Sequence, residues 1–260
     1  MNINAYLERI NYKGPLSPTA ETLRRLQVAH LQAVPFENLS IHANEPIVLE
    51  DQALFEKIVS RRRGGFCYEL NGLFAALLRE LGFKVEMLSA GVANDKGVFG
   101  PDFDHMALLV TTPEEPQKRW LADVGFGDSF NEPLLLDERS EQPQGQRSYR
   151  IDPDGDHLIL SQRQDAAEWK PQYRFMVKPH TYSDYQEMCH YHQTSPESHF
   201  TKGRLCSRAT PDGRITLSGL RFITNTKDGR EERTLPDENA YEQLLREEFG
   251  IEMNRSAARL

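Results

Sequence analysis

The sequence predicts an α+β fold in which helices and strands are segregated along the chain. Apolar residues in the first 82 positions recur at the three-to-four-residue spacing of helices, and from residue 84 the spacing changes towards the two-residue alternation of strands. The last part of the chain mixes both patterns. This order is that of an α+β protein and differs from the regular strand–helix alternation of a doubly wound sheet.

Two helices are predicted before residue 34. Ser17 is expected to cap the second one, because Pro18 follows it and proline is favoured at the first helical position. The residues expected on the inward faces of these two helices are Ile3, Leu7, Ile10, Leu23, Leu26 and His30.

Two more helices are predicted between residues 51 and 82. Asp51 is expected to cap the first of them, and its inward residues are Leu54, Phe55, Ile58 and Val59. The second is the clearest helix of the chain; it has Cys67 in its first turn and ends at Gly82. Its apolar face consists of Leu70, Leu73, Phe74, Leu77, Leu78 and Leu81.

The strands are predicted from alternating apolar residues and from turn residues between them. The expected strands are residues 84–92, 105–111, 119–124, 148–151, 157–162, 169–177, 214–217 and 220–224, with one more after the turn at residues 227–229. Residues 152–155 are expected to form a hairpin turn, and the polar residues 137–147 an exposed loop. A short helix is expected within 181–192, and a final amphipathic helix ends at Gly250.

Composition and charge exclude several classes of function. The 260 residues carry a net charge of −8, which argues against nucleic acid as a partner. No apolar run reaches the roughly 18 residues of a membrane-spanning helix, so no membrane partner is expected. The N-terminus has neither a basic start nor an apolar block, so we expect no secretory signal and a cytoplasmic location.

The three cysteines do not form a recognisable disulfide or metal pattern. No C-x-x-C spacing occurs, and three thiols cannot all pair. The cluster of Cys189, His190, His192, His199 and Cys206 matches no usual zinc site. We therefore expect no metal.

Cys67 is the strongest candidate for a nucleophile. Gly64 and Gly65 precede it, and it opens a helix, where free N–H groups and the positive end of the helix dipole lower the pKa of a thiol. A buried structural cysteine is the alternative, since cysteine is among the most buried residue types.

A thiol nucleophile needs a base and a group that orients the base. His105 opens one predicted strand, and Asp123 ends the next. Asp123 has apolar neighbours in sequence and is costly to bury unless it is paired, and adjacent strands can bring it beside His105. Structural roles for each of the two residues remain open at this point.

Several runs of the sequence resemble the motifs of the arylamine N-acetyltransferases. They are residues 63–71 around Cys67, residues 34–39, the strand that begins at His105, residues 123–127 and residues 195–202. The spacing of 38 residues from Cys67 to His105 and of 18 from His105 to Asp123 is also within the range of that family. The resemblance extends from about residue 5 to about residue 250.

The resemblance implies both an architecture and a reaction. It implies a helical domain at 1–83, a β-barrel-like domain at 84–180 and an α/β lid at 181–260, with a papain-like triad of Cys67, His105 and Asp123. Acetyl-CoA would acetylate Cys67, and an arylamine, arylhydroxylamine or hydrazine would then accept the acetyl group. His105 would move the protons, and Asp123 would fix the tautomer of its ring.

Other residues in these motifs have expected supporting roles. Arg63 and Glu37 are predicted to form a buried pair that holds the Cys67 loop, with a surface pair as the alternative. The rings of Phe36, Phe66 and Phe126 are candidates for an aryl pocket, although each is also typical of a core. By resemblance, Phe126 is the first choice.

The CoA phosphates need cations or N–H groups on an otherwise acidic chain. Basic residues gather at Lys202, Arg204, Arg208, Arg214 and Arg221, although a solvated basic face would look the same. By resemblance, CoA is expected between residues 101–103, including Asp102 and Phe103, and the strand around Arg221. Asp102 would contact a pyrophosphate only through its backbone.

Three other functions share part of this pattern. An amide synthase of related fold would use the same cysteine on a larger polyketide. A thiol hydrolase or transglutaminase-like enzyme would use the same triad with water or lysine as the acceptor. A non-catalytic binding module is disfavoured because Cys67, His105 and Asp123 are all present.

Overall fold

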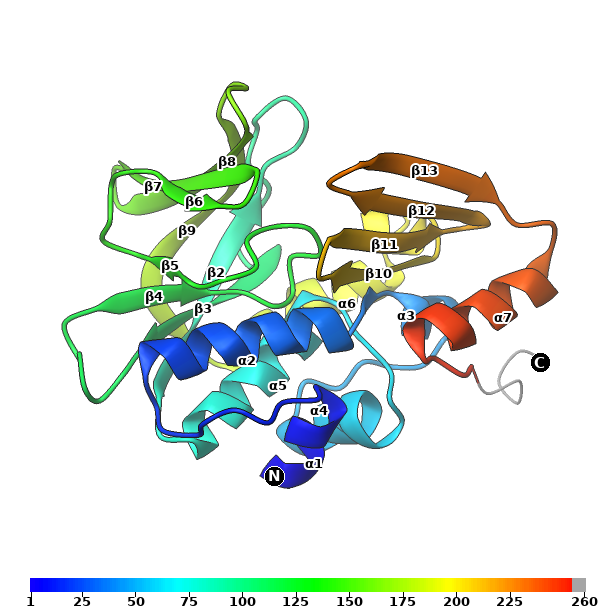
Figure 1. Cartoon of the computed structure of the whole chain (residues 1–260), viewed down its shortest axis with the longest axis horizontal. Coiled ribbons are helices and arrows are strands. Elements are labelled where there is room, and N and C mark those ends of the chain that lie inside the picture. The colour runs from blue at the N-terminus through cyan, green and yellow to red at the C-terminus, as the bar shows by residue number, and fades with distance from the viewer. Residues whose placement is uncertain (254–260) are drawn as a thin grey trace.

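The computed structural model describes residues 1–253. Its helices are α1 (Ile3–Arg9), α2 (Ala20–Ala33), α3 (Leu39–His42), α4 (Asp51–Phe55), the π-helix η1 (Glu56–Ser60), α5 (Cys67–Glu80), the 3₁₀ helix η2 (Tyr182–Tyr185), α6 (Gln186–Thr194), the 3₁₀ helix η3 (His199–Thr201) and α7 (Glu238–Phe249). The predicted α+β class is confirmed: helices come first, and most strands follow residue 84 (Figure 1).

The strands form two antiparallel sheets. The larger has the order β5-β4-β3-β2-β9-β8-β7-β6, and the smaller the order β1-β10-β11-β12-β13. Their bounds are β1 (Phe36–Glu37), β2 (Lys84–Val92), β3 (His105–Thr111), β4 (Arg119–Ala122), β5 (Leu134–Leu135), β6 (Gln142–Gln144), β7 (Arg147–Asp154), β8 (His157–Gln164), β9 (Lys170–His180), β10 (Leu205–Thr210), β11 (Gly213–Ser218), β12 (Arg221–Thr226) and β13 (Gly229–Thr234).

The larger sheet curls into a nearly closed barrel, and its two edges are linked by a side chain. The Gln142 amide in β6 accepts a hydrogen bond from the backbone N–H of Leu135 in β5 at 2.7 Å and donates one to its carbonyl oxygen at 2.9 Å. The edge strands therefore satisfy backbone groups that would otherwise be open to pairing with another chain. Aromatic and aliphatic side chains such as Phe130, Tyr149 and Tyr173 fill the interior.

Helix α5 is the centre of the helical layer. Twelve of its residues are buried, and its apolar face packs on α1, α4, β2 and β3. The helix runs beneath the barrel beside α2 (Figure 1). The helix predicted from the apolar pattern is thereby confirmed, including its end near Gly82, which has the left-handed φ of 93° typical of a residue after a helix.

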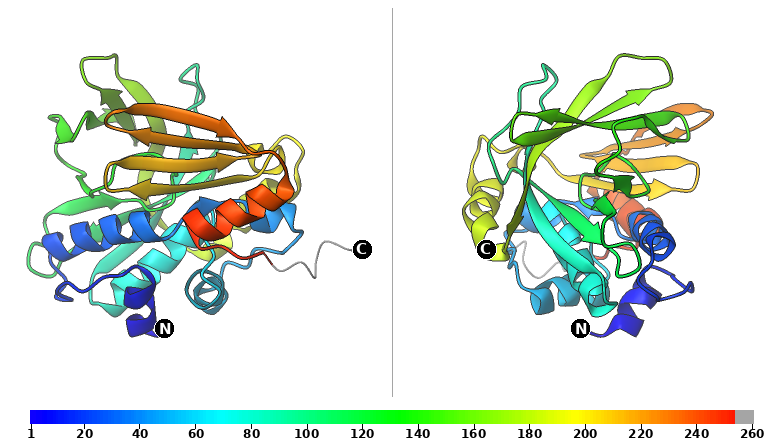
Figure 2. Two further views of the ribbon diagram at one scale, coloured as in Figure 1. Left: turned by 45° about the vertical axis from the view of Figure 1, so that its right-hand side comes forward. Right: turned by 90° about the vertical axis from the view of Figure 1, so that its left-hand side faces the viewer.

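The smaller sheet combines one strand from the early part of the chain with four strands from its late part. Its edge strand β1 comes from the helical part and pairs with β10, while α7 covers one face of the sheet (Figure 2). Tyr241, Leu244 and Phe249 of α7 pack there against Leu217 and Phe222. The division into domains at residues 83 and 180 stays a prediction, and residues 254–260 of its third part lie outside the described residues.

Two predicted helix starts are wrong. The second helix begins at Ala20 rather than after Ser17, because the Thr19 hydroxyl accepts the hydrogen bond from the N–H of Thr22 at 3.2 Å. The N-cap of α4 is Glu50, and Asp51 is its first helical residue. The Asp51 carboxylate instead accepts a hydrogen bond from a tyrosine of η2 at 2.9 Å.

Two predictions of loops also need correction. Residues 137–147 are not all loop, because 142–144 form β6 and pair with β7. The hairpin turn lies later than expected: β7 continues through Asp154, and the chain turns at Gly155, whose φ of 60° suits glycine. In both cases pairing with the next strand of a hairpin extends the strand through polar residues and a proline, which local propensity alone assigns to a loop or turn.

Candidate active site

Cys67 is the first residue of α5 and is buried. The residue before it, Phe66, is the N-cap, and the backbone N–H of Phe66 donates a hydrogen bond to the Glu69 carboxylate at 3.1 Å. One of the free N–H groups at the helix start is therefore satisfied by a carboxylate on the same turn.

The pKa of the Cys67 thiol is raised, opposite to the sequence-based expectation. Burial is the largest cause, because it disfavours the thiolate; a hydrogen bond from the backbone of Met106 acts in the other direction. The charges of Asp104 and Asp123 raise the pKa further. The effect of burial on the thiol pKa is therefore opposite to that of the helix start.

His105 and Asp123 form a buried hydrogen-bonded pair. Asp123 follows β4, His105 opens the neighbouring strand β3, and His105 Nε2 lies 2.7 Å from Asp123 Oδ2. A carboxylate only accepts hydrogen bonds, so Nε2 carries the hydrogen and Nδ1 is left as the basic nitrogen. The next residue on β3 is Met106, whose backbone contacts the Cys67 sulfur.

Two residues that the sequence analysis did not single out also bind the Asp123 carboxylate. The Asn71 amide donates to Oδ1 at 2.8 Å, and the Tyr173 hydroxyl donates to Oδ2 at 3.3 Å. Asn71 lies four residues after Cys67 and therefore on the same helical face, a spacing that could have identified it. Tyr173 is on β9, and no local pattern connects it with Asp123.

Gly125 brings the segment after β4 against the start of α5. Its backbone N–H donates to Asp123 Oδ1 at 2.8 Å. A Cβ atom at this position would lie 2.8 Å from Cys67 Cα and 2.7 Å from Asn71 Nδ2. Only glycine permits this close approach.

The loop before Cys67 is fixed by buried ion pairs. Arg63 and Glu37 lie 2.9 Å apart with almost no exposure, so the predicted pair is present and buried. Lys57, which the sequence analysis missed, pairs with Glu69 at 2.6 Å. Burial raises the pKa of Glu37, but the charges of Lys57 and Arg63 outweigh it and hold that pKa below its usual value.

The three phenylalanines have different surroundings. The Phe126 ring is partly exposed and packs edge-on against His105, with centroids 5.2 Å apart. Phe36 is nearly buried and approaches Phe200 at 6.2 Å. Phe66 is fully buried, with Tyr68 at 4.9 Å, so its ring is part of the core behind the site.

The predicted cofactor residues lie on exposed or partly exposed segments. Asp102 and Lys202 are exposed, and Arg221 is exposed with Glu232 3.3 Å away. Phe103 has an unusual positive φ of 63°, and its ring packs against His180 at 4.9 Å.

The other basic residues of the predicted cluster have partners within the protein. Arg204 forms two hydrogen bonds with Glu238, and Arg208 donates to the backbone carbonyl oxygens of Gln32 and Glu248. Arg214 is buried and bonds to Asp128. These contacts make Lys202 and Arg221 the more accessible cations of that cluster.

Two further observations concern other kinds of site. Within residues 1–253, no group of three or more His, Cys, Asp or Glu side chains is arranged to hold a metal ion, and none of the helices has the length and apolar character of a membrane span.

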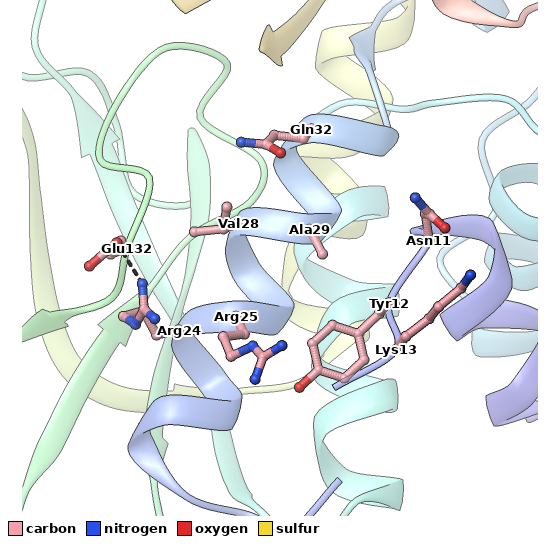
Figure 3. A pocket seen from close by; sticks show the side chains of 9 residues that line it. All are labelled: Asn11, Tyr12, Lys13, Arg24, Arg25, Val28, Ala29, Gln32 and Glu132. Carbon is pink, nitrogen blue, oxygen red and sulfur yellow. Dashed lines mark hydrogen bonds and ion pairs between the residues drawn. The ribbon is translucent and has the colours of Figure 1, made fainter. Parts of the chain in front are cut away.

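A cavity of about 480 Å³ lies on the outer face of α2 beside Tyr12 and Lys13 (Figure 3). It is separate from Cys67, and its Arg24 is engaged by Glu132 at 2.9 Å.

Replacing Gly125 with alanine is expected to destabilise the fold, because the new Cβ would overlap backbone atoms of Cys67. We expect a loss of about 1–3 kcal/mol in the free energy of unfolding, measured by urea denaturation. Gly203→Ala is the matched control, since no atom lies within 4 Å of a Cβ there. Equal stability of the two variants would contradict the close approach.

Comparisons with known proteins agree with these features. The family model described as N-acetyltransferase matches residues 19–258. The arylamine N-acetyltransferase of Escherichia coli K12 is 36% identical over 96% of this chain and 88% of its own length. The arylamine N-acetyltransferase / N-hydroxyarylamine O-acetyltransferase of Salmonella typhimurium is 36% identical over 97% of this chain and 89% of its own length.

The same family is found among solved structures. The structure of Mycobacterium marinum arylamine N-acetyltransferase in complex with CoA superposes with a TM-score of 0.88 at 36% identity, covering 96% of this chain and 93% of that chain. A family match over most of the chain, together with relatives of this identity and coverage, leads to one conclusion: the chain belongs to the arylamine N-acetyltransferase family.

Proposed function

We propose that this protein transfers the acetyl group of acetyl-CoA to the nitrogen of an arylamine, an arylhydroxylamine or a hydrazine, through an acetyl-Cys67 intermediate. The observation that carries the proposal is the hydrogen bond between His105 and Asp123, with His105 next to Met106, whose backbone contacts the Cys67 sulfur. The names of the relatives supply the substrate class.

The first half-reaction needs a base, because burial raises the pKa of the Cys67 thiol. His105 Nδ1 takes the proton from Cys67 as the sulfur attacks the thioester carbonyl of acetyl-CoA. A new S–C bond forms on Cys67, the bond from the acetyl carbon to the CoA sulfur breaks, and the imidazolium returns the proton to that leaving sulfur. Asp123 stabilises the imidazolium and keeps the ring oriented.

In the second half-reaction the amine is the nucleophile and acetyl-Cys67 is the acetyl donor. The amine nitrogen attacks the acetyl-Cys67 carbonyl, His105 accepts the proton that the nitrogen loses, and the C–S bond breaks to regenerate the thiol. A neutral arylamine is a weak nucleophile, so a thioester is a suitable activated donor. Phe126, whose ring packs on His105, is the proposed contact for the aryl ring, and Phe36, which lies next to Gly127, is a second proposed contact.

CoA is proposed to bind along the segment of Asp102 and Phe103 and near Lys202 and Arg221. The CoA complex of the M. marinum relative supports CoA as co-substrate. Lys202 and Arg221 are exposed cations, which suits contacts with phosphates.

Incubation with acetyl-CoA is expected to add one acetyl group to Cys67, detected by intact mass and peptide mapping. Adding an arylamine should remove it and give the N-acetyl product. Cys67→Ala should show neither event, whereas Cys189→Ala, which removes another buried thiol, should retain both. Loss of the adduct to water at the same rate without an amine would instead indicate a hydrolase.

Asp123→Asn is expected to lower kcat by about a hundredfold or more, because the ring of His105 loses its tautomer control. Circular dichroism should show that the variant folds. The control is Asp137→Asn, which breaks an exposed ion pair with Arg119 far from Cys67 in sequence. Near-normal turnover of Asp123→Asn would show that another group orients His105.

Arg221→Ala is expected to raise the KM for acetyl-CoA a few-fold and to leave the reaction of preformed acetyl-enzyme with an amine unchanged, because CoA has left before the amine attacks. Higher salt should have the same effect on the parent protein, since exposed charge contacts are screened. Arg246→Ala on exposed α7 is the control. Equal damage to both half-reactions would assign Arg221 a structural role.

A further inference from the structure

A second histidine faces a carboxylate close to the triad. His192 is in the last turn of α6, and its side chain is only 5% exposed. Its Nε2 atom lies 3.4 Å from Oδ1 of Asp104, the residue that precedes His105 in the chain. Neither side chain belongs to the triad itself.

The surroundings of the His192 ring decide which nitrogen carries its hydrogen. Nδ1 lies 3.2 Å from the hydroxyl oxygen of Ser198, and that oxygen accepts a hydrogen bond from the N–H of Phe200. The rings of Phe66 and Phe200 pack edge-on against the imidazole, with centroids 6.4 and 5.0 Å away. Because a carboxylate only accepts hydrogen bonds, the tautomer that suits both neighbours carries its hydrogen on Nε2, beside Asp104.

The Nε2 atom of His192 is buried and has no hydrogen-bond partner among residues 1–253. At 3.4 Å the Asp104 carboxylate is too far away for a good hydrogen bond, but it is close enough to feel the N–H dipole, or the charge of a protonated ring. Buried polar atoms without a partner are rare and costly, so this placement requires a physical reason.

The turn that carries Asp104 is fixed by hydrogen bonds to β2. The Asp104 Oδ2 atom accepts a hydrogen bond from the backbone N–H of Val92 at 3.3 Å. The preceding residue, Phe103, has a left-handed φ of 63°, and its N–H donates to the hydroxyl of Ser89 at 2.7 Å. These contacts leave the Asp104 carboxylate little freedom to move away from His192.

The charge of Asp104 acts on the sulfur of Cys67. Burial is the main cause of the raised pKa of this thiol, and the charge of Asp104 raises that pKa further, with a larger effect than the charge of Asp123. Burial also raises the pKa of Tyr68, and the charges of Cys67 and Asp104 both add to that shift. The Tyr68 hydroxyl donates to the carbonyl oxygen of Phe103, so it links the helix of Cys67 to the turn of Asp104. A group that offsets the Asp104 charge therefore makes the thiolate easier to form.

We propose that His192 is a positioning residue of the reaction that acts through Asp104: its ring nitrogen offsets the Asp104 carboxylate and thereby makes the Cys67 thiolate easier to form. This inference rests on the proposed function, in which Cys67 is the nucleophile, and it adds a residue of α6 to that reaction.

Other titratable groups lie near the same side chains. Apart from Asp104, the groups whose rings or charges act on His192 or on Cys67 are Tyr68, Tyr191, Asp123 and Cys189. The test variants keep all four of them, and His105 as well. A change in the reactivity of the thiol in these variants therefore reports on His192 and Asp104.

The test follows the alkylation of Cys67 by iodoacetamide as a function of pH, without acetyl-CoA, and uses peptide mapping to separate Cys67 from Cys189 and Cys206. Asp104→Asn removes the charge, so we expect the alkylation midpoint to move down by about one pH unit. His192→Phe keeps an aromatic ring but removes the nitrogen, so we expect the midpoint to move up by about half a unit. The double variant should match Asp104→Asn, because His192 acts through Asp104.

Matched variants separate this effect from unrelated changes. Asp95→Asn removes the same charge from an exposed loop, and His190→Phe replaces an exposed histidine of the same helix; both should keep the parent's midpoint. His192→Gln, whose amide can donate to Asp104, should lie closer to the parent than His192→Phe does. His192→Leu gives a second way to remove the nitrogen if circular dichroism shows that His192→Phe does not fold.

The acetylation of Cys67 by acetyl-CoA is then measured in the same variants. We expect His192→Phe to slow this step about threefold, the factor that corresponds to half a pH unit, with the KM for acetyl-CoA nearly unchanged. Three results would overturn the inference: no shift in Asp104→Asn, shifts of both single variants in the same direction, or additive shifts in the double variant. The last two would indicate loosened packing. The expected alkylation shifts in a protein that transfers no acetyl group would contradict the proposed function alone.

Discussion

The buried carboxylate of Asp123 is the constraint on which the rest of the site depends. It accepts hydrogen bonds from His105 on β3, Asn71 on α5, Tyr173 on β9 and the backbone of Gly125. An unpaired carboxylate at this depth would cost several kcal/mol. The helix and the barrel must therefore dock where these four donors converge, and that docking brings Cys67 to the strand of His105.

A second set of buried charges holds the chain in front of Cys67. Both ion pairs are almost completely buried: Arg63 of the loop before α5 pairs with Glu37 of β1, and Lys57 of η1 pairs with Glu69 of α5. Because Glu69 also caps the helix start, its charge serves both the ion pair and the backbone. These charges hold the chain in front of a buried thiol, and burial raises the pKa of that thiol.

Charged side chains from the two sheets meet where the sheets face each other. Net charge describes the average surface and argues against nucleic acid, but it does not describe how individual charges pair inside the fold. Arg147 comes from the barrel and Arg214 from the smaller sheet, and they meet only because Asp128 lies between them. The interface of the two sheets thus holds an ion cluster that neither sheet contains alone.

The sequence by itself determined the fold class, the position of α5 and most strands, because apolar periodicity and turn residues act over a few positions. It also singled out Cys67, His105 and Asp123, through a helix start, two strand ends and resemblance to a family. Only the tertiary structure decided which distant groups meet, such as Tyr173 with Asp123 or Arg147 with Arg214, since strand register and sheet order bring them together. The tertiary structure also shows that the pKa of the Cys67 thiol is raised, whereas the sequence predicted a lowered pKa. Burial is the main cause, and it depends on how the whole molecule packs and not on the local sequence.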